Sequence, residues 1–151
     1  MTALADAADL GTPGVHDREL PGVDGAVRVG CDVVRVERVV ALLARRPAAR
    51  DLLFTPREQA DAVRDGVGPD SPEALRRLAA RFAAKEAVTK LLSRPRLAWT
   101  DVEVRRGPDG APSLWLRGEP CDVTVSLSHD GDVALAMVAC AVSRLPEMPP
   151  R

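Results

Sequence analysis

The sequence predicts an α+β domain in which a mainly antiparallel sheet packs on one long helix. Two pairs of strand-like runs indicate the sheet, because each pair is separated by a short turn signal. The runs WTDVEVRR and PSLWLR flank GPDGA, while CDVTVSLSH and DVALAMVACAV flank Asp130 and Gly131. A long helix is indicated by Ser71 and Pro72, which form a start signal for a segment that continues to about residue 92.

The length of 151 residues predicts one domain, large enough to bury a hydrophobic core without a disulfide or a structural metal. Ends rich in Asp, Gly and Pro predict disordered tails at 1–25 and 144–151 around a folded domain at 26–143. The three cysteines lie in apolar runs without metal-ligand spacing. We find neither a signal peptide nor a membrane span, and therefore expect a cytoplasmic protein.

The net charge of −1 gives the whole protein little attraction for nucleic acid or anionic lipid, so a charged partner would need a local patch. Such a patch is expected in the first elements. Residues 26–32 read as a strand, and residues 33–46 as a helix that Pro47 ends. Helical spacing places apolar residues on one side of this helix, namely Val33, Val36, Val40 and Leu43. It places a basic stripe on the other side, formed by Arg35, Arg38, Arg45 and Arg46.

A short helix is expected to follow at FTPREQ. Thr55 can serve as its N-cap, Pro56 fits the first turn, and Glu58 stands in capping-box position.

The long helix carries both lysines of the chain, Lys85 and Lys90. Because a solvated Lys is readily replaced by Arg in such an arginine-rich sequence, their survival indicates a need for a compact ammonium, although chance is an alternative. Glu86 projects within about 40° of the apolar seam of this helix and needs a cation, a metal or hydrogen bonds there. A solvated Glu86–Lys90 pair, worth a few tenths of a kcal/mol, would explain the lysine but not the inward carboxylate. The seam consists of Leu75, Leu78 and Phe82.

Asp32 ends the first predicted strand, where it is equally consistent with a helix N-cap and with a metal ligand. His129 ends the run VSLSH, in which Ser128 belongs to the opposite, polar face. A histidine at such a position is more often structural than functional when it stands alone. Together, two carboxylates suit Mg²⁺ bound to a substrate phosphate, and Lys, Arg and His suit the remaining phosphate charge.

Five segments resemble, in order and spacing, the holo-acyl-carrier-protein synthases, the small type of 4'-phosphopantetheinyl transferase. They are GCDVVRVERV, FTPREQ, RFAAKEAVTKLL, WTDVEV and VSLSHDGDVALAMV, and the match extends over about residues 27–142. The resemblance implies the 4'-phosphopantetheinyl transferase fold. It also implies Mg²⁺-dependent transfer of phosphopantetheine from coenzyme A to a serine of an apo carrier protein, with release of adenosine 3',5'-bisphosphate. The carrier could belong to fatty acid, polyketide or nonribosomal peptide synthesis.

The resemblance also implies roles for individual residues. Asp32 and Glu86 would bind Mg²⁺, Glu86 could accept the serine proton directly or through water, and Lys90 would hold phosphate oxygens. The residues implied for the nucleotide phosphates are Arg81, Lys85 and His129, with Ser128 lining the same pocket. For docking an acidic carrier, the resemblance implies Arg38. Arg35 makes the docking stripe more basic than is usual in the family, and Arg45 and Arg46 extend it by geometry alone. A solvated face is the alternative for the extension. The small type forms homotrimers with active sites at subunit boundaries, which is the assembly expected here.

The sequence departs from the family pattern at three places. Arg28 replaces the first glycine of the Gly-x-Gly that precedes Asp32, Arg35 replaces an acidic residue, and SRPRLAW replaces a Gly-Thr-Gly loop near the substrate. The alternative is a catalytically inactive relative that binds coenzyme A or a carrier as an assembly or regulatory subunit, although the presence of Asp32, Glu86, Lys90 and His129 argues against it. A nucleic-acid-binding module fits the arginine stripe, but it leaves the inward Glu86 unexplained and conflicts with the near-neutral charge.

Overall fold

The structure is a computed structural model that describes residues 25–94 and 97–147. The tails predicted at 1–25 and 144–151 lie mostly outside these residues, as do two positions of the SRPRLAW segment. The helices and strands follow in the order β1 (Val27–Arg35), α1 (Val36–Arg45), α2 (Ala49–Leu53), α3 (Pro56–Ala62), α4 (Pro72–Leu92), β2 (Val102–Arg106), β3 (Pro112–Leu116), β4 (Glu119–Pro120), β5 (Thr124–Asp130) and β6 (Val133–Ala141).

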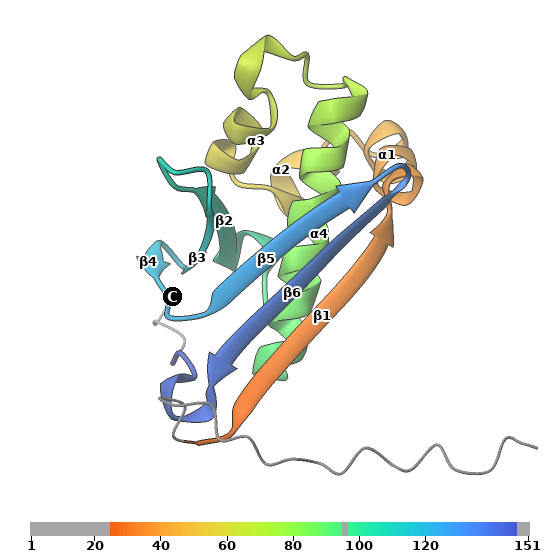
Figure 1. The fold of residues 1–151 in the computed structure, drawn as a ribbon. Coiled ribbons are helices and arrows are strands. Elements are labelled where there is room, and N and C mark those ends of the chain that lie inside the picture. Colours follow the sequence, from red (N-terminus) through yellow and green to blue (C-terminus); the bar gives the residue numbers. More distant parts are fainter. Residues whose placement is uncertain (1–24, 95–96, 148–151) are drawn as a thin grey trace, which may run out of the picture.

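The strands form two antiparallel sheets, with the orders β1-β6-β5 and β2-β3-β4. The predicted α+β class is confirmed, and so are the two predicted hairpins, β2–β3 and β5–β6. Figure 1 shows α4 running along one face of the β1-β6-β5 sheet, with α1, α2 and α3 gathered at one end. β1 and β5 are the two edge strands of this sheet within the chain.

One face of the β1-β6-β5 sheet forms the core with α4, whereas the other face is open. The core face buries alternate residues, among them Val34, Val125, Ala134, Ala136 and Val138. Large apolar side chains are exposed on the open sheet face, namely Val27, Val29, Val33, Leu135 and Met137. The alternation follows from the two-residue period of a strand.

The boundary between the first strand and the first helix differs from the prediction. The strand continues through Arg35, because Val33 and Val34 pair with Leu135 and Ala134 of β6. β-branched residues fit such a ladder well, so the partner strand overrides the helical pattern. Helix α1 buries Val39 and Leu43. Of the predicted set, Leu43 is therefore confirmed and Val36 packs half-buried against the core, whereas Val33 lies exposed on the strand. The four arginines of the predicted stripe are all exposed, with Arg35 on the strand.

Both predicted helix starts are confirmed. Thr55 and Glu58 form a reciprocal capping box at α3, and the Ser71 side chain accepts a hydrogen bond from the Ala74 amide at α4. Helix α4 is buried over most of its circumference, because sheet and helices surround it. The predicted seam of Leu75, Leu78 and Phe82 is therefore only part of its buried surface. Helix α2 was not predicted, since its sequence contains no capping signal.

Candidate active site

Asp32 and Lys90 meet where β1 crosses the last turn of α4. The Lys90 ammonium donates to Asp32 Oδ1 at 2.8 Å and to the Cys31 carbonyl at 2.9 Å. The hydrogen bond to Asp32 raises the pKa of Lys90, so the lysine remains a cation at neutral pH. Asp32 lies within the strand, and the N-cap of α1 is Arg35, which makes no side-chain capping bond. The helix-cap alternative for Asp32 is therefore wrong.

Gly30 allows β1 and α4 to approach closely beside this ion pair. A Cβ atom at position 30 would lie 2.1 Å from the carbonyl oxygen of Ala87, far inside van der Waals contact. Asp32 follows Gly30 by two residues and therefore points to the same face of the strand. Glu86 directly precedes Ala87 in α4. The missing side chain thus brings the strand carrying one carboxylate against the helix turn carrying the other.

Glu86 is half-buried at the edge of the core, between the buried Lys85 and Ala87. The sequence had predicted that Glu86 points toward the core. Its charge contributes to the raised pKa of Lys90, but the Lys90 ammonium bonds directly to Asp32 instead. No hydrogen bond or salt bridge reaches Glu86 from the described residues. Its carboxylate is therefore available to a proton or a cation.

The donor set of Asp32 and Glu86 fits a magnesium ion that arrives with a phosphate. Mg²⁺ usually takes one or two carboxylates and completes its shell with water and phosphate oxygens. Over 25–94 and 97–147, the structure has no group of three or more His, Cys, Asp or Glu side chains that could hold a metal ion. A closed structural zinc site needs four such ligands and is not supported by these residues.

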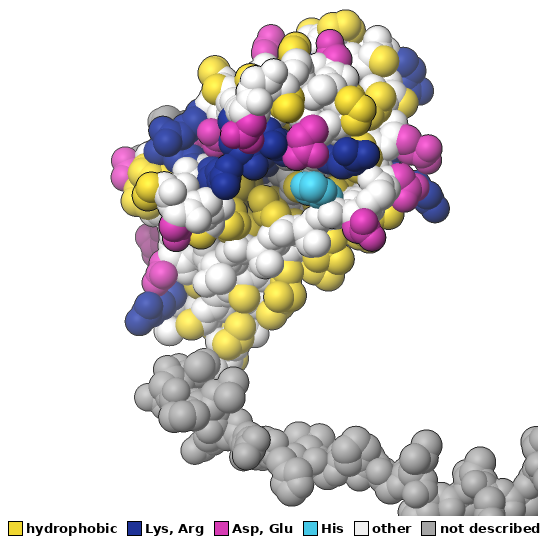
Figure 2. Space-filling model, turned by 45° about the horizontal axis from the view of Figure 1, so that its top comes forward, with side chains coloured by type: hydrophobic (Ala, Val, Ile, Leu, Met, Phe, Trp, Pro, Cys, Tyr) yellow, Lys and Arg dark blue, Asp and Glu magenta, His cyan; other side chains and the backbone are white. Residues whose placement is uncertain are grey.

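A second cluster surrounds a pocket of about 210 Å³ between α4, β2 and β5. Arg81 and His129, both predicted to contact phosphate, line it together with four further arginines that the sequence analysis did not single out: Arg64, Arg77, Arg105 and Arg106. Figure 2 shows basic and acidic side chains gathered in a band across the face that carries the histidine. These arginines come from three separate parts of the chain, namely α4, β2 and the turn after α3, and the fold brings the three parts together.

The arginine pocket has unused capacity for an anion. Arg81 is 5% exposed and pairs with Asp61 at 3.4 Å, yet its Nε has no hydrogen-bond partner. Repulsion from Arg77 and Arg106 adds to burial in lowering the pKa of Arg64. A bound phosphate would relieve this repulsion and accept the unused N–H group.

Lys85 lies in the core and not in this pocket. Its ammonium contacts Glu58 at 2.7 Å and donates to the carbonyls of Trp99 at 2.8 Å and Val102 at 2.7 Å. Glu58 also accepts a hydrogen bond from the Val104 amide at 2.9 Å. Burial lowers the pKa of Lys85, and Glu58 opposes this shift. All three donors of the ammonium are used, so the geometry favours a structural role over the expected phosphate contact.

Ser128 also lies elsewhere than expected. It pairs with the exposed Leu135 on the open sheet face, whereas His129 pairs with the buried Ala134 on the core face. The two neighbours therefore point to opposite sides of the sheet, and Ser128 does not line the arginine pocket.

The two clusters occupy opposite edges of one sheet. Asp32 pairs with Ala136 of β6, which pairs with Leu127 of β5, a residue that lines the arginine pocket. Two strand spacings separate Asp32 from Leu127, which is roughly 10 Å along the row. Within a single chain, the Asp32–Lys90 pair and the arginine pocket thus lie on different sides of α4.

Helix α1 carries a basic surface, which we call the α1 arginine face and define as Arg38, Arg45 and Arg46. All three are exposed, and none forms a salt bridge with a carboxylate of the described part of the chain. Arg45 donates only to the Ala41 carbonyl of its own helix. Arg35 differs, because it pairs with Asp132 at 3.1 Å.

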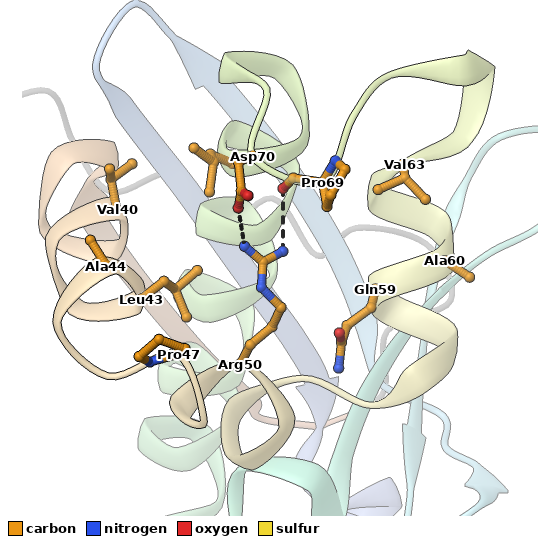
Figure 3. Close-up of a pocket in the computed structure, with 11 residues that line it drawn as sticks. Val40, Leu43, Ala44, Pro47, Arg50, Gln59, Ala60, Val63, Pro69 and Asp70 are labelled. Atoms are coloured by element: carbon orange, nitrogen blue, oxygen red, sulfur yellow. Dashed lines mark hydrogen bonds and ion pairs between the residues drawn. The ribbon is translucent and has the colours of Figure 1, made fainter.

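A larger cavity of about 820 Å³ lies between α1, α2, α3 and the start of α4. Figure 3 shows Arg50 reaching across it to Asp70 and to the carbonyl of Pro69. Its remaining lining is mostly apolar and includes none of the predicted site residues. The chemistry suggested by the sequence is therefore not located in this larger cavity.

The model of the 4'-phosphopantetheinyl transferase superfamily matches residues 28–138. The chain belongs to this superfamily. The holo-[acyl-carrier-protein] synthase of Salinispora arenicola is 48% identical over 122 residues, which cover 74% of this chain and 95% of that protein. The synthase of Frankia alni is 47% identical, with coverages of 74% and 94%.

Solved structures agree with this assignment. The ACPS–CoA complex of Chronobacterium ammoniagenes has a TM-score of 0.63 and 27% identity, covering 76% of this transferase and 96% of that chain. The holo-(acyl-carrier-protein) synthase of Bacillus anthracis in complex with CoA (3',5'-ADP) has a TM-score of 0.62 and 26% identity, with the same coverages. No helix in the described part of this transferase is long and apolar enough to cross a membrane.

Arg28, which replaces a glycine of the family pattern, contacts helix α4. The guanidinium of Arg28 donates to the Leu91 carbonyl at 3.2 Å, at the C-terminal end of α4. A cation at this end is favoured by the helix dipole. The bond fastens the start of β1 to α4 at the residue that directly follows Lys90.

Proposed function

We propose that this transferase moves 4'-phosphopantetheine from coenzyme A to a serine hydroxyl of an apo carrier protein and releases adenosine 3',5'-bisphosphate. The observation that carries the proposal is the convergence of Asp32, Glu86 and Lys90 at the crossing of β1 and α4. Two carboxylates and an ammonium are the groups that a metal-bound diphosphate needs, because phosphoryl transfer depends mainly on alignment and charge neutralisation.

The position of each residue indicates its role in the proposed reaction. Asp32 and Glu86 would hold Mg²⁺, which neutralises the diphosphate of coenzyme A when it is bound. Lys90 is half-exposed and can turn its ammonium from Asp32 to a phosphate oxygen. Glu86, which no described side chain engages, accepts the proton of the attacking serine. Arg81 and His129 bind a phosphate of the nucleotide in the arginine pocket.

A complete site requires two copies of the chain. The carboxylate cluster lies at the β1 edge of the sheet and the arginine pocket at the β5 edge, so one molecule of coenzyme A would bridge the β1 edge of one copy and the β5 edge of the next. The open sheet face, rich in exposed Val, Leu and Met, supports such association. We infer a homotrimer with active sites between subunits, acting in the cytoplasm.

The carrier docks on the α1 arginine face. Arg38 and Arg45 lack a carboxylate partner in the described chain and are free to meet an acidic surface. Arg35 contributes less, because Asp132 already neutralises it. The carrier belongs either to fatty acid synthesis or to polyketide or nonribosomal peptide synthesis.

Mass spectrometry tests the proposal. The protein is incubated with coenzyme A, Mg²⁺ and several apo carrier proteins, and the products are weighed. The expected result is a mass gain equal to phosphopantetheine on one serine of at least one carrier. Binding of coenzyme A without any mass gain across the carriers would contradict the transferase reaction and favour the inactive-relative alternative.

A further inference from the structure

The first 24 residues carry the opposite charge to the rest of the chain. They contain five acidic residues and one basic residue, Arg18. The acidic residues are Asp6, Asp9, Asp17, Glu19 and Asp24. Subtracting them from the totals of 22 acidic and 21 basic residues leaves 17 and 20, a net charge of +3 on residues 25–151. The negative charge of the protein therefore resides in its first segment.

This segment also lies outside the family. The superfamily model begins at residue 28, and the Salinispora relative is covered over 95% of its length by only 74% of this chain. The shared transferase reaction therefore does not account for the acidic segment.

The α1 arginine face has no carboxylate partner among residues 25–94 and 97–147. Most other arginines of the described part have a carboxylate close by, such as Arg50 with Asp70, Arg77 with Glu73 and Arg144 with Asp122. Three neighbouring exposed arginines without such a partner repel one another and attract an anionic segment.

Geometry decides which acidic residues can reach this face. The nine residues of β1 separate the start of the described chain from α1 and span roughly 30 Å. Asp6 and Asp9 precede Gly25 by 19 and 16 residues, enough chain for about 50 Å or more. Asp24 directly precedes Gly25, so the chain between them is too short to span the length of β1 and reach α1.

We propose that residues 1–24 bind the α1 arginine face of their own chain through Asp6 and Asp9 and compete there with the acidic carrier. The competition rests on the proposed function, but the intramolecular contact does not. A segment tethered this close has an effective concentration in the millimolar range. Weak ion pairs between Asp6 or Asp9 and the arginines therefore suffice for the segment to occupy the α1 arginine face part of the time. The segment then acts as a built-in, salt-sensitive competitor that raises the carrier concentration needed for transfer.

The test compares two full-length double variants that each remove two negative charges. Asp6→Asn/Asp9→Asn removes the residues that can reach α1. Asp24→Asn/Glu119→Gln is the matched control, because Asp24 cannot reach α1 and Glu119 lies exposed on β4. Backbone amide chemical shifts of residues 36–46 are recorded at low salt without coenzyme A or carrier. The first variant is expected to shift these amides from their wild-type positions and the control is not.

Carrier kinetics give the second measurement. Asp6→Asn/Asp9→Asn is expected to lower the KM for the carrier about threefold at low ionic strength, with kcat and the KM for coenzyme A unchanged. The ratio to wild type is expected to return to one near 1 M salt, where the Debye length is about 3 Å. Unchanged amide shifts, or equal shifts in both variants, would overturn the intramolecular contact. Shifts without a change in KM would overturn the competition. Absence of transfer in every protein would contradict the proposed function and leave the amide shifts to decide the contact.

Discussion

Replacing Gly30 by alanine should impair transfer much more than it impairs folding. The added Cβ would lie 2.1 Å from the Ala87 carbonyl oxygen and 3.1 Å from Leu91 Cβ. Carbon and oxygen normally approach no closer than about 3.3 Å, so β1 and α4 must separate by roughly 1 Å. Overpacking of this kind costs about 1–3 kcal/mol of stability. A 1 Å displacement of reacting groups costs about 100-fold in rate, because Asp32 moves away from the turn that carries Glu86.

The assay for Gly30→Ala is the rate of phosphopantetheine transfer, measured well below a melting temperature determined by circular dichroism. Gly68→Ala is the matched control, since a Cβ there would meet no atom within 4 Å. We expect the control to keep wild-type rate and stability. A folded Gly30→Ala protein that transfers at the wild-type rate would refute the positioning role of this glycine.

Four further predictions concern charged side chains. Glu86→Gln should abolish turnover, because the amide cannot accept the serine proton. The melting temperature should stay unchanged, because the Glu86 carboxylate makes no hydrogen bond or salt bridge within the described chain. Unchanged turnover, measured by mass spectrometry, would contradict the role assigned to Glu86. Arg38→Glu should raise the KM for the carrier at least tenfold, which corresponds to about 1.4 kcal/mol, and should leave coenzyme A binding unchanged. Arg57→Glu, an exposed control on α3, should change neither quantity. Equal losses of carrier use and of coenzyme A binding in Arg38→Glu would count against docking on α1. Lys85→Met should lower the free energy of unfolding in urea by about 3–5 kcal/mol, since it strands a buried carboxylate. The pKa of Lys90 is raised above its ordinary value of 10.5, so its stabilising contact is complete below that pH and is lost as the pH rises through the higher folded value. The melting-temperature difference between wild type and Lys90→Met should therefore stay constant from neutral pH to about pH 10 and then shrink.

Local signals predicted the parts of the fold that local chemistry determines. The Thr55 capping box, the Ser71 start of α4 and both hairpins depend on neighbouring residues, and each was confirmed. The end of β1 depends on β6, more than 90 residues away, and was placed too early. The segment VVRVERVV is rich in β-branched residues, and only the presence of a partner strand decides between strand and helix.

In the candidate site, too, features set by neighbouring residues were predicted, and features set by distant residues were not. The two-residue alternation of β5 already placed Ser128 and His129 on opposite faces, and the structure agrees. The expectation that Ser128 shares a pocket with His129 came from the resemblance and conflicts with that alternation. The arginine pocket was missed, because its members come from α4, β2 and the turn after α3. Helical spacing places Arg77 and Arg81 on one face of α4, but no spacing in the sequence brings Arg64, Arg105 and Arg106 to them.

The buried Lys85 links the arginine pocket and the carboxylate cluster. By helical geometry Arg81 lies about 40° from Lys85 on one side, whereas Glu86 lies about 100° away on the other. A rotation of α4 would therefore move the arginine pocket and the carboxylate cluster at the same time. Lys85 resists this rotation, because its ammonium reaches Glu58, Trp99 and Val102 in three directions. The planar fork of an arginine could not point its donors in these directions, which explains why a lysine survives here in an arginine-rich chain.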